Sequence, residues 1–340
     1  MVKIACYLLI FTLSFAQNSN MLDCSSTAVH TESIDNQLRI DKARISSIDY
    51  SSDAKMLAAA GSTIVKIWDS AKLLYELEQD GNVKEIAFAH SGKFLTVAVN
   101  DPRRRTASTV SFWSLSTGQK LSEYTEKENP ISTIALSSDE NLLSVGLFNG
   151  KVKLFDIKDI NNIKSINQQF ADFGSAISAI SFSKDSSLLA IGVGSGQANG
   201  GKVSVIKIAD KQELYSSSKM KNILNLKFSP DNSLLVFAGI VVQPEATFAL
   251  SIIGTEDWKE QEFIKDYPCG KGLAFSNNSS LLISGAQFAD SGATLAIKDL
   301  KSKTVKLLQE SFILTSMALS PDGKKVALGS DNGKIKIRNL

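Results

Sequence analysis

Residues 319–340 read Leu-Ser-Pro-Asp-Gly-Lys-Lys-Val-Ala-Leu-Gly-Ser-Asp-Asn-Gly-Lys-Ile-Lys-Ile-Arg-Asn-Leu, and this stretch decides the fold. Two turn sequences, Pro321-Asp322-Gly323 and Asp331-Asn332-Gly333, separate short segments in which apolar and polar residues alternate. Proline fixes φ, and glycine or asparagine accepts the positive φ that tight turns between strands require. A period of two residues is typical of a strand with one buried face. The stretch therefore predicts three antiparallel strands joined by two turns.

The same pattern occurs six more times upstream. Each copy starts with an apolar residue, here called the anchor, that precedes a turn of the type Ser-x-Asp. The seven anchors are Tyr50, Phe88, Leu136, Phe182, Phe228, Phe275 and Leu319. They recur every 38 to 48 residues, which is close to the period of four-stranded propeller blades. Since one blade cannot bury both of its faces, blades stack in a ring. The sequence therefore predicts an all-β fold, a seven-bladed β-propeller of four-stranded antiparallel blades.

The third strands of the copies have related endings, which are Trp68-Asp69, Trp113-Ser114, Phe155-Asp156, Lys298-Asp299 and Arg338-Asn339. Together with the Ser-x-Asp turns, these endings resemble the WD40 repeat family over nearly all of residues 34–340. The Gly-His dipeptide of that family is absent, because neither His30 nor His90 follows a glycine. The His–Asp–Ser–Trp network of many WD40 blades therefore cannot form. The resemblance implies a non-catalytic scaffold that presents loops to partner proteins.

The last copy contains three strands, so its fourth strand must come from elsewhere in the chain. Residues Ile34 to Asp41 alternate in polarity just before the first anchor strand, Ile45 to Tyr50. We expect Ile34 to Asp41 to pair with Lys334 to Asn339 and to close the ring, as in relatives of the WD40 family. Closure of this kind removes exposed sheet edges.

Residues 1–16 differ from the repeats. Lys3 precedes an apolar stretch that ends with the small residues Ser14 and Ala16. This is the pattern of a cleaved signal peptide. The stretch is shorter than the roughly 20 apolar residues that span a bilayer, so we expect no stable membrane insertion. The prediction is a secreted protein, or one in the lumen of the secretory pathway. Two alternatives remain. Residues 1–16 could form a buried strand, or translation could start at Met21, which would leave the protein in the cytoplasm.

Residues 17–33 are polar and rich in serine and threonine, and we expect a flexible tail before the propeller of residues 34–340. An oxidising compartment would permit a disulfide between Cys24 in this tail and Cys269, but a flexible tail gives no geometric reason for one, so we favour two free or buried thiols. Asn277 and Asn278 begin two overlapping Asn-x-Ser sequons in the first turn of the sixth copy. Either asparagine could carry a glycan in a secretory protein.

The copies differ most in their second turn. It is short in the first, third and seventh copies and expanded in the other four, over residues 100–108, 194–201, 240–246 and 287–292. Because equivalent turns emerge on one face of a propeller, we predict that this face binds a partner. The candidate partner-binding residues are Arg103, Arg104, Arg105, Gln243, Glu245, Phe288 and Asp290.

The three consecutive arginines suit an acidic partner, because guanidinium groups form forked hydrogen bonds with carboxylates or phosphates. A solvated loop tip and a proteolytic processing site are the other interpretations of the same residues. The glycine-rich turn of residues 194–201 lacks the lysine of a phosphate-binding loop, so we interpret it as a long hairpin.

The sequence offers little for catalysis. It has two histidines and no Cys/His cluster with metal-ligand spacing, so we expect no enzyme activity, no metal and no cofactor. The net charge of +2 argues against a nucleic-acid partner. We therefore predict a protein-binding scaffold, monomeric within a larger assembly, whose partner is a protein or peptide. The alternatives are a cytosolic scaffold subunit of a multiprotein complex, and a propeller enzyme or sugar-binding protein whose carboxylates converge on the central channel.

Overall fold

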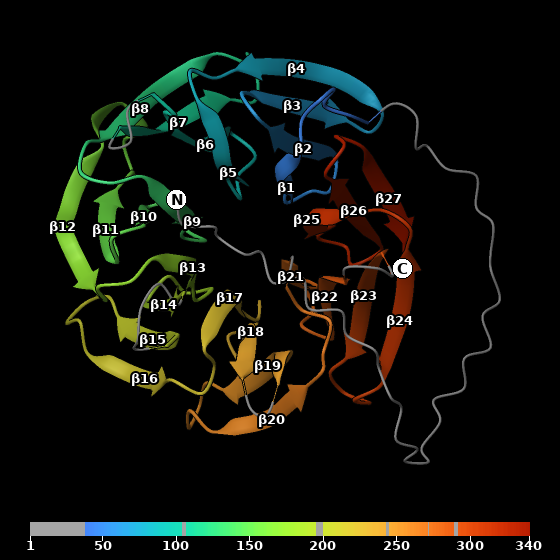
Figure 1. The fold of residues 1–340 in the computed structure, drawn as a ribbon. Helices are drawn as coiled ribbons and strands as arrows, with labels where there is room; N and C mark the ends of the chain where they lie inside the picture. The colour runs from blue at the N-terminus through green and yellow to red at the C-terminus, as the bar shows by residue number, and fades with distance from the viewer. Residues whose placement is uncertain (1–37, 104–106, 195–199, 243–244, 271, 289–291) are drawn as a thin grey trace, which may run out of the picture. The chain divides into compact units, whose positions relative to one another are not determined.

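The computed structural model describes residues 38–103, 107–194, 200–242, 245–270, 272–288 and 292–340. Within these residues, six antiparallel sheets of four strands and one of three strands follow one another around a central axis (Figure 1). Strands within each sheet stand in chain order, so each sheet is a meander. The prediction of a seven-bladed β-propeller is confirmed.

The first blade contains β1 (Ile45–Tyr50), β2 (Met56–Gly61), β3 (Ile64–Asp69) and β4 (Lys72–Glu78), and the second contains β5 (Asn82–Phe88), β6 (Phe94–Asn100), β7 (Ser108–Ser114) and β8 (Lys120–Glu126). The third contains β9 (Ile131–Leu136), β10 (Leu142–Leu147), β11 (Lys151–Asp156), the short 3₁₀ helix η1 (Ile160–Asn162) and β12 (Lys164–Asp172). The fourth contains β13 (Ile177–Phe182), β14 (Leu188–Val193), β15 (Lys202–Lys207) and β16 (Glu213–Ser217).

The fifth blade contains β17 (Asn222–Phe228), β18 (Leu234–Val242), β19 (Ala246–Gly254) and β20 (Glu260–Lys265), and the sixth contains β21 (Gly272–Phe275), β22 (Leu281–Phe288), β23 (Gly292–Asp299) and β24 (Val305–Glu310). The seventh contains β25 (Leu314–Leu319), β26 (Lys325–Ser330) and β27 (Ile335–Asn339). No helix in the described part of the chain is long and apolar enough to cross a bilayer.

The Ser-x-Asp turns are self-contained units. In the fifth blade, Ser229 Oγ donates to Asp231 Oδ1 at 2.6 Å and accepts the N–H of Leu234 at 2.9 Å. The same pair of bonds recurs at Ser51, Ser137, Ser183, Ser276 and Ser320. In every blade, the residue four places after the anchor has positive φ; for example, φ is 61° at Asn232 and 72° at Gly323. Because these bonds span only a few residues, the turn forms independently of its surroundings.

The hydrophobic core consists of seven clusters, one between each pair of neighbouring blades. Between the fourth and fifth blades, for example, Val203 and Val205 of β15 pack with Phe237 of β18. The residue ten places after the anchor is glycine or alanine in every copy. A Cβ at one of these positions, Gly329, would lie 2.6 Å from Cγ2 of Ile45 in the next blade. The small residue therefore permits the close approach of blades.

The innermost strands β1, β5, β9, β13, β17, β21 and β25 contact one another in this order, and β25 contacts β1. Packing of the first blade on the last therefore closes the ring. Ahead of β1, Arg39 forms one isolated antiparallel bridge with Lys334, and the Ile335 N–H donates to Leu38 O at 3.0 Å. Residues 34–37 lie outside the described residues. A complete fourth strand in the last blade therefore stays a prediction.

Two of the expanded second turns are shorter than the sequence predicted. In the fifth blade, β18 continues to Val242, and Ile240 pairs with Phe248 of β19. In the sixth, β22 continues to Phe288, which pairs with Gly292. The added residues of β18 and β22 continue the hydrogen-bonded pairing of their strands, because apolar residues fit the surface of a sheet. A copy with more residues between its second and third strands can therefore have longer strands and not a longer loop.

Candidate functional site

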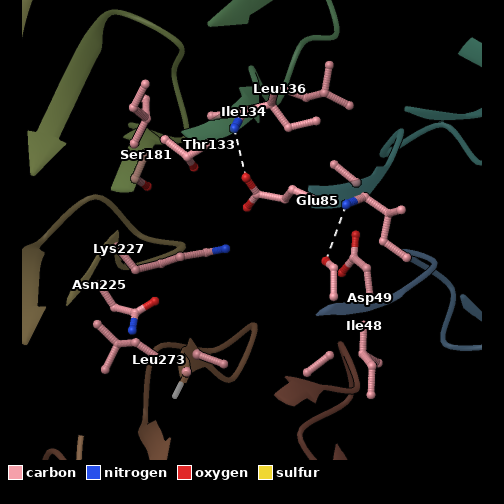
Figure 2. Close-up of a pocket in the computed structure, with 18 of the residues that line it drawn as sticks. Ile48, Asp49, Glu85, Thr133, Ile134, Leu136, Ser181, Asn225, Lys227 and Leu273 are labelled. Atoms are coloured by element: carbon pink, nitrogen blue, oxygen red, sulfur yellow. Dashed lines mark hydrogen bonds between the residues drawn. The ribbon is translucent and has the colours of Figure 1, made fainter. Parts of the chain in front are cut away.

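The central channel forms a cavity of about 620 Å³ that is lined by residues of all seven blades. Alternation of side chains along the inner strands determines which residues face it. Two positions of each inner strand supply the lining. The residues one place before the anchors are Asp49, Ala87, Ala135, Ser181, Lys227, Ala274 and Ala318. The residues three places before six of the anchors are Ser47, Glu85, Thr133, Asn225, Gly272 and Ser316. The channel is thus polar. Figure 2 shows the two carboxylates on neighbouring blades and Lys227 of the fifth blade, and Lys84 and Lys184 also line the cavity.

Both carboxylates hold neighbouring blades together. Asp49 Oδ2 accepts the N–H of Phe88 in the second blade at 2.8 Å. Glu85 Oε2 accepts the N–H of Ile134 in the third blade at 2.8 Å (Figure 2). Ser181 repeats the arrangement, because its Oγ accepts the N–H of Phe228 at 3.2 Å. These side chains satisfy backbone N–H groups that the inner strands leave unpaired on this side.

Burial governs the charge of the channel. Desolvation raises the pKa of Asp49 to about 6, although the N–H of Phe88 and the charge of Lys227 act in the opposite direction. The same cause raises the pKa of Glu85. Figure 2 shows Lys227 extending into the channel from the fifth blade. Perturbed carboxylates in a cavity are common at functional sites, but these two already accept hydrogen bonds from the backbone. A structural role explains them.

In the sequence, these channel residues could have been found by counting back from each anchor. Asp49 stands one place before the anchor Tyr50, and Glu85 stands three places before the anchor Phe88. Most other copies have a small or uncharged residue at these positions. The convergence of carboxylates on the channel, one of the alternatives drawn from the sequence, is present. No group of three or more His, Cys, Asp or Glu side chains in the described residues is placed to hold a metal ion.

The predicted partner-binding residues are only partly described. Arg103 is exposed, and its N–H donates to Asp101 Oδ1 at 2.8 Å; Glu245 is exposed between β18 and β19. The backbone of Phe288 ends β22. The others, Arg104, Arg105, Gln243 and Asp290, lie outside the described residues.

Large apolar side chains are exposed at three points on the face of the second turns. Phe148 in the second turn of the third blade is 48% exposed, Val242 at the end of β18 is 51% exposed, and Ile313 before β25 is 48% exposed. Lys84 Nζ lies 5.9 Å from the ring centroid of Phe148, which is within the range of a cation–π contact. Val242 lies in the expanded second turn of residues 240–246, whereas Phe148 and Ile313 are single apolar residues in loops and carry no periodic signal.

The loop that enters the third blade on this face is partly buried. Glu126 and Lys153 form an ion pair at 2.9 Å with side chains that are 1% and 7% exposed. Tyr124 Oη donates to Glu126 Oε2 at 2.8 Å, and Lys153 also contacts Glu128 at 3.3 Å. These groups lie beside a second cavity of about 230 Å³. The pair joins the outer strand of the second blade to β11, which makes it a structural contact between blades.

Cys269 is fully buried, and its Sγ donates to Ala249 O at 3.3 Å. Burial raises the pKa of this thiol to about 12, so it is neither accessible nor reactive. Cys24 lies outside the described residues. Asn277 and Asn278 are both exposed in the first turn of the sixth blade. Asn278 Oδ1 accepts the Ser276 hydroxyl at 2.7 Å, as the aspartate does in other turns, so Asn277 is the one without a role in the turn.

Comparison with known families identifies the repeats. A model of the family described as WD domain, G-beta repeat matches residues 36–69, 118–156 and 302–339. Each match ends at the third strand of a blade, which is β3, β11 or β27. The chain therefore contains WD40 repeats at these three positions. Propellers of this family generally act as scaffolds that bind other proteins.

A solved structure confirms the architecture independently of these matches. A chain in the crystal structure of a mitotic checkpoint complex superposes with a TM-score of 0.72, over 95% of this chain and 99% of that chain. The sequence identity is 17%. At this level of identity, the likeness establishes the WD40-type fold and no more.

Proposed function

We propose that this WD40 protein is a non-catalytic scaffold that binds a protein or peptide through the face of its second turns. The observation that carries the proposal is the exposure of Phe148, Val242 and Ile313 on three different blades of one face. Exposed apolar side chains rimmed by polar residues are typical of protein-binding surfaces. A scaffold role also agrees with the channel carboxylates, because Asp49 and Glu85 serve as hydrogen-bond acceptors between blades.

The test compares two sets of substitutions in affinity capture from the native source, followed by mass spectrometry. Changing Phe148, Val242 and Ile313 to serine should remove specific partners. Changing Leu121 and Leu307 to serine is the control, because these side chains are also exposed but lie on outer strands. Since all five are exposed, the melting temperature should not change in either variant. Partners that are lost only from the outer-strand variant would contradict the proposed face.

We infer in addition that the protein works in the secretory pathway, on the basis of the apolar stretch before Gln17. Intact mass and N-terminal sequencing of the native protein test this. A chain that begins near Gln17, with or without a glycan on Asn277, would support the secretory proposal. A chain that begins at Met21 and is found in the cytoplasm would overturn it and favour a cytosolic scaffold subunit of a multiprotein complex.

A further inference from the structure

The channel meets the face of the second turns at a surface shared by the second and third blades. Lys84, near the start of β5, lines the channel and is exposed. Its Nζ lies 5.9 Å from the centre of the Phe148 ring, which belongs to the next blade and is 48% exposed. A cation and an aromatic ring therefore stand side by side at the mouth of the channel.

Hydrogen bonds hold the surrounding loops in place. Asn100, at the end of β6, donates through Nδ2 to Ile131 O at 2.9 Å and accepts the Ile131 N–H at 3.0 Å. The residue before Ile131 is Pro130, whose carbonyl accepts the Phe148 N–H at 3.1 Å. This chain of contacts connects Asn100, three residues before Arg103, to Phe148 in the second turn of the third blade.

The charge of this surface is positive. Lys84, Arg103 and Lys127 are exposed, and they form no ion pair with any carboxylate in the described residues. Most nearby acidic groups already have partners. Glu128 pairs with Lys151 at 3.3 Å, Glu126 is buried against Lys153, and Asp101 accepts the N–H of Arg103 at 2.8 Å. Lys84, which also acts on the buried carboxylate of Glu85, places an exposed positive charge beside the Phe148 ring.

We propose that Lys84, Arg103 and Phe148 bind an acidic peptide segment of a partner protein that also carries an apolar side chain. One carboxylate of the peptide pairs with Lys84 at the channel mouth, and a second accepts forked hydrogen bonds from Arg103. The apolar side chain covers the exposed part of the Phe148 ring. The proposal rests on the proposed function, because it places the partner on the face of the second turns. Charge complementarity of this kind favours selective and rapid association.

The experiment selects ligands from a random nonapeptide library displayed on phage, with the full chain immobilised. We expect enriched peptides to be acidic and to contain a large apolar residue. A labelled synthetic copy of the most enriched peptide is then titrated against the wild type, Lys84→Glu and Phe148→Ala. Both variants should bind about tenfold more weakly or worse, because each removes a charge-assisted or aromatic contact. Binding to the wild type should weaken as salt is added.

Two substitutions serve as controls. Lys221→Glu reverses an exposed charge before β17 on the same face, and Leu307→Ala truncates a side chain that is 52% exposed on the outer strand β24. Both should bind like the wild type. Thermal melting of all four variants checks that the fold is intact.

The inference is overturned if the library yields no enriched peptide, if the enriched peptides are neutral or basic, or if Lys84→Glu and Phe148→Ala leave affinity unchanged. Loss of binding in Lys221→Glu alone would overturn this site and leave the proposed face in place, and loss of binding in Leu307→Ala alone would overturn both. Peptides that are insensitive to every substitution on this face would count against both. A labelled oligothymidine that binds better than any selected peptide would show that the surface prefers nucleic acid.

Discussion

Replacing Asp49 by asparagine tests the physical account of the channel. Asp49 faces the channel, and its carboxylate accepts the N–H groups of Phe88 and Tyr50 at 2.8 and 2.9 Å. Asparagine has nearly the same shape, and its amide oxygen can still accept the N–H of Phe88 from the next blade. The substitution therefore removes the ionisation of this group while it keeps the contact between blades.

The magnitude follows from the pKa of Asp49, which burial raises from 3.8 to about 6. Because the pKa is higher in the folded than in the unfolded chain, the folded chain binds more protons between about pH 4 and 6. The free energy of unfolding then falls as the pH rises through this window. At about 1.4 kcal/mol for each pKa unit, the ionised carboxylate costs about 3 kcal/mol above pH 6. Asp49→Asn does not ionise and avoids this cost. The free energy of unfolding of the variant minus that of the wild type should therefore rise by about 3 kcal/mol between pH 4 and pH 7.

The assay is urea unfolding of the wild type and Asp49→Asn from pH 3.5 to 7.5, followed by circular dichroism. The free energy of unfolding of Asp49→Asn minus that of the wild type should be constant below pH 4 and should rise towards pH 7. Glu85 titrates in both proteins, so its effect largely cancels. Asp53→Asn is the control with the opposite slope, because hydrogen bonds from Ser51 and Lys55 lower the pKa of Asp53. A flat or falling difference for Asp49→Asn would refute the reasoning.

Three further predictions concern the contacts that build the ring. Ser229→Ala removes an Oγ that both donates and accepts within its turn, and urea unfolding should show a loss of about 1–3 kcal/mol. Lys153→Met leaves Glu126 buried without its cation, so we expect the free energy of unfolding to fall by about 3–5 kcal/mol. The double variant with Glu126→Gln should lose much less stability than the sum of the two single variants. The register of the bridge at the last blade puts Asn36 opposite Ile337, so cysteines at these two positions should form a disulfide on mild oxidation, detected by intact mass.

Each of these predictions has a control. Ser233→Ala lies in the same turn but is exposed, and it should cost less than Ser229→Ala. Additive losses at Lys153 and Glu126 would show that the two side chains are not coupled. For the disulfide, cysteine at Asp35 with cysteine at Ile337 is out of register and should stay reduced. Equal oxidation of both pairs would contradict an ordered fourth strand.

The family comparison adds an argument for that fourth strand. The second matched segment begins just before β8, the outer strand of the second blade, and ends in the third blade. The third begins just before β24, the outer strand of the sixth blade, and ends in the seventh blade. The first match begins at residue 36, where the equivalent position belongs to the segment that bridges Lys334. The start of this match and the alternation of the side chains both favour the prediction that this segment supplies the fourth strand.

The sequence by itself determined the strands, the turns and the number of blades, because each depends on interactions within a few residues. Ser229, Asp231 and the positive φ of Asn232 form their turn locally, and the same signal occurs in nearly every copy. The anchors then place Asp49 and Glu85 on the channel side by simple alternation, although only comparison of all copies makes these residues stand out. The period between anchors is sufficient to predict a ring.

Only the tertiary structure decided which residues from different blades meet. Glu126 ends the outer strand β8 next to a loop, yet it is buried because Lys153 of the next blade lies beside it. Lys84 and Phe148 are separated by 64 positions in the chain, and neither carries a pattern that indicates the other. Such contacts depend on how neighbouring blades stack, which is set by side chains along their whole interface. Local sequence therefore specifies each blade, and packing between blades specifies the channel, the ion pairs and the surface available to a partner.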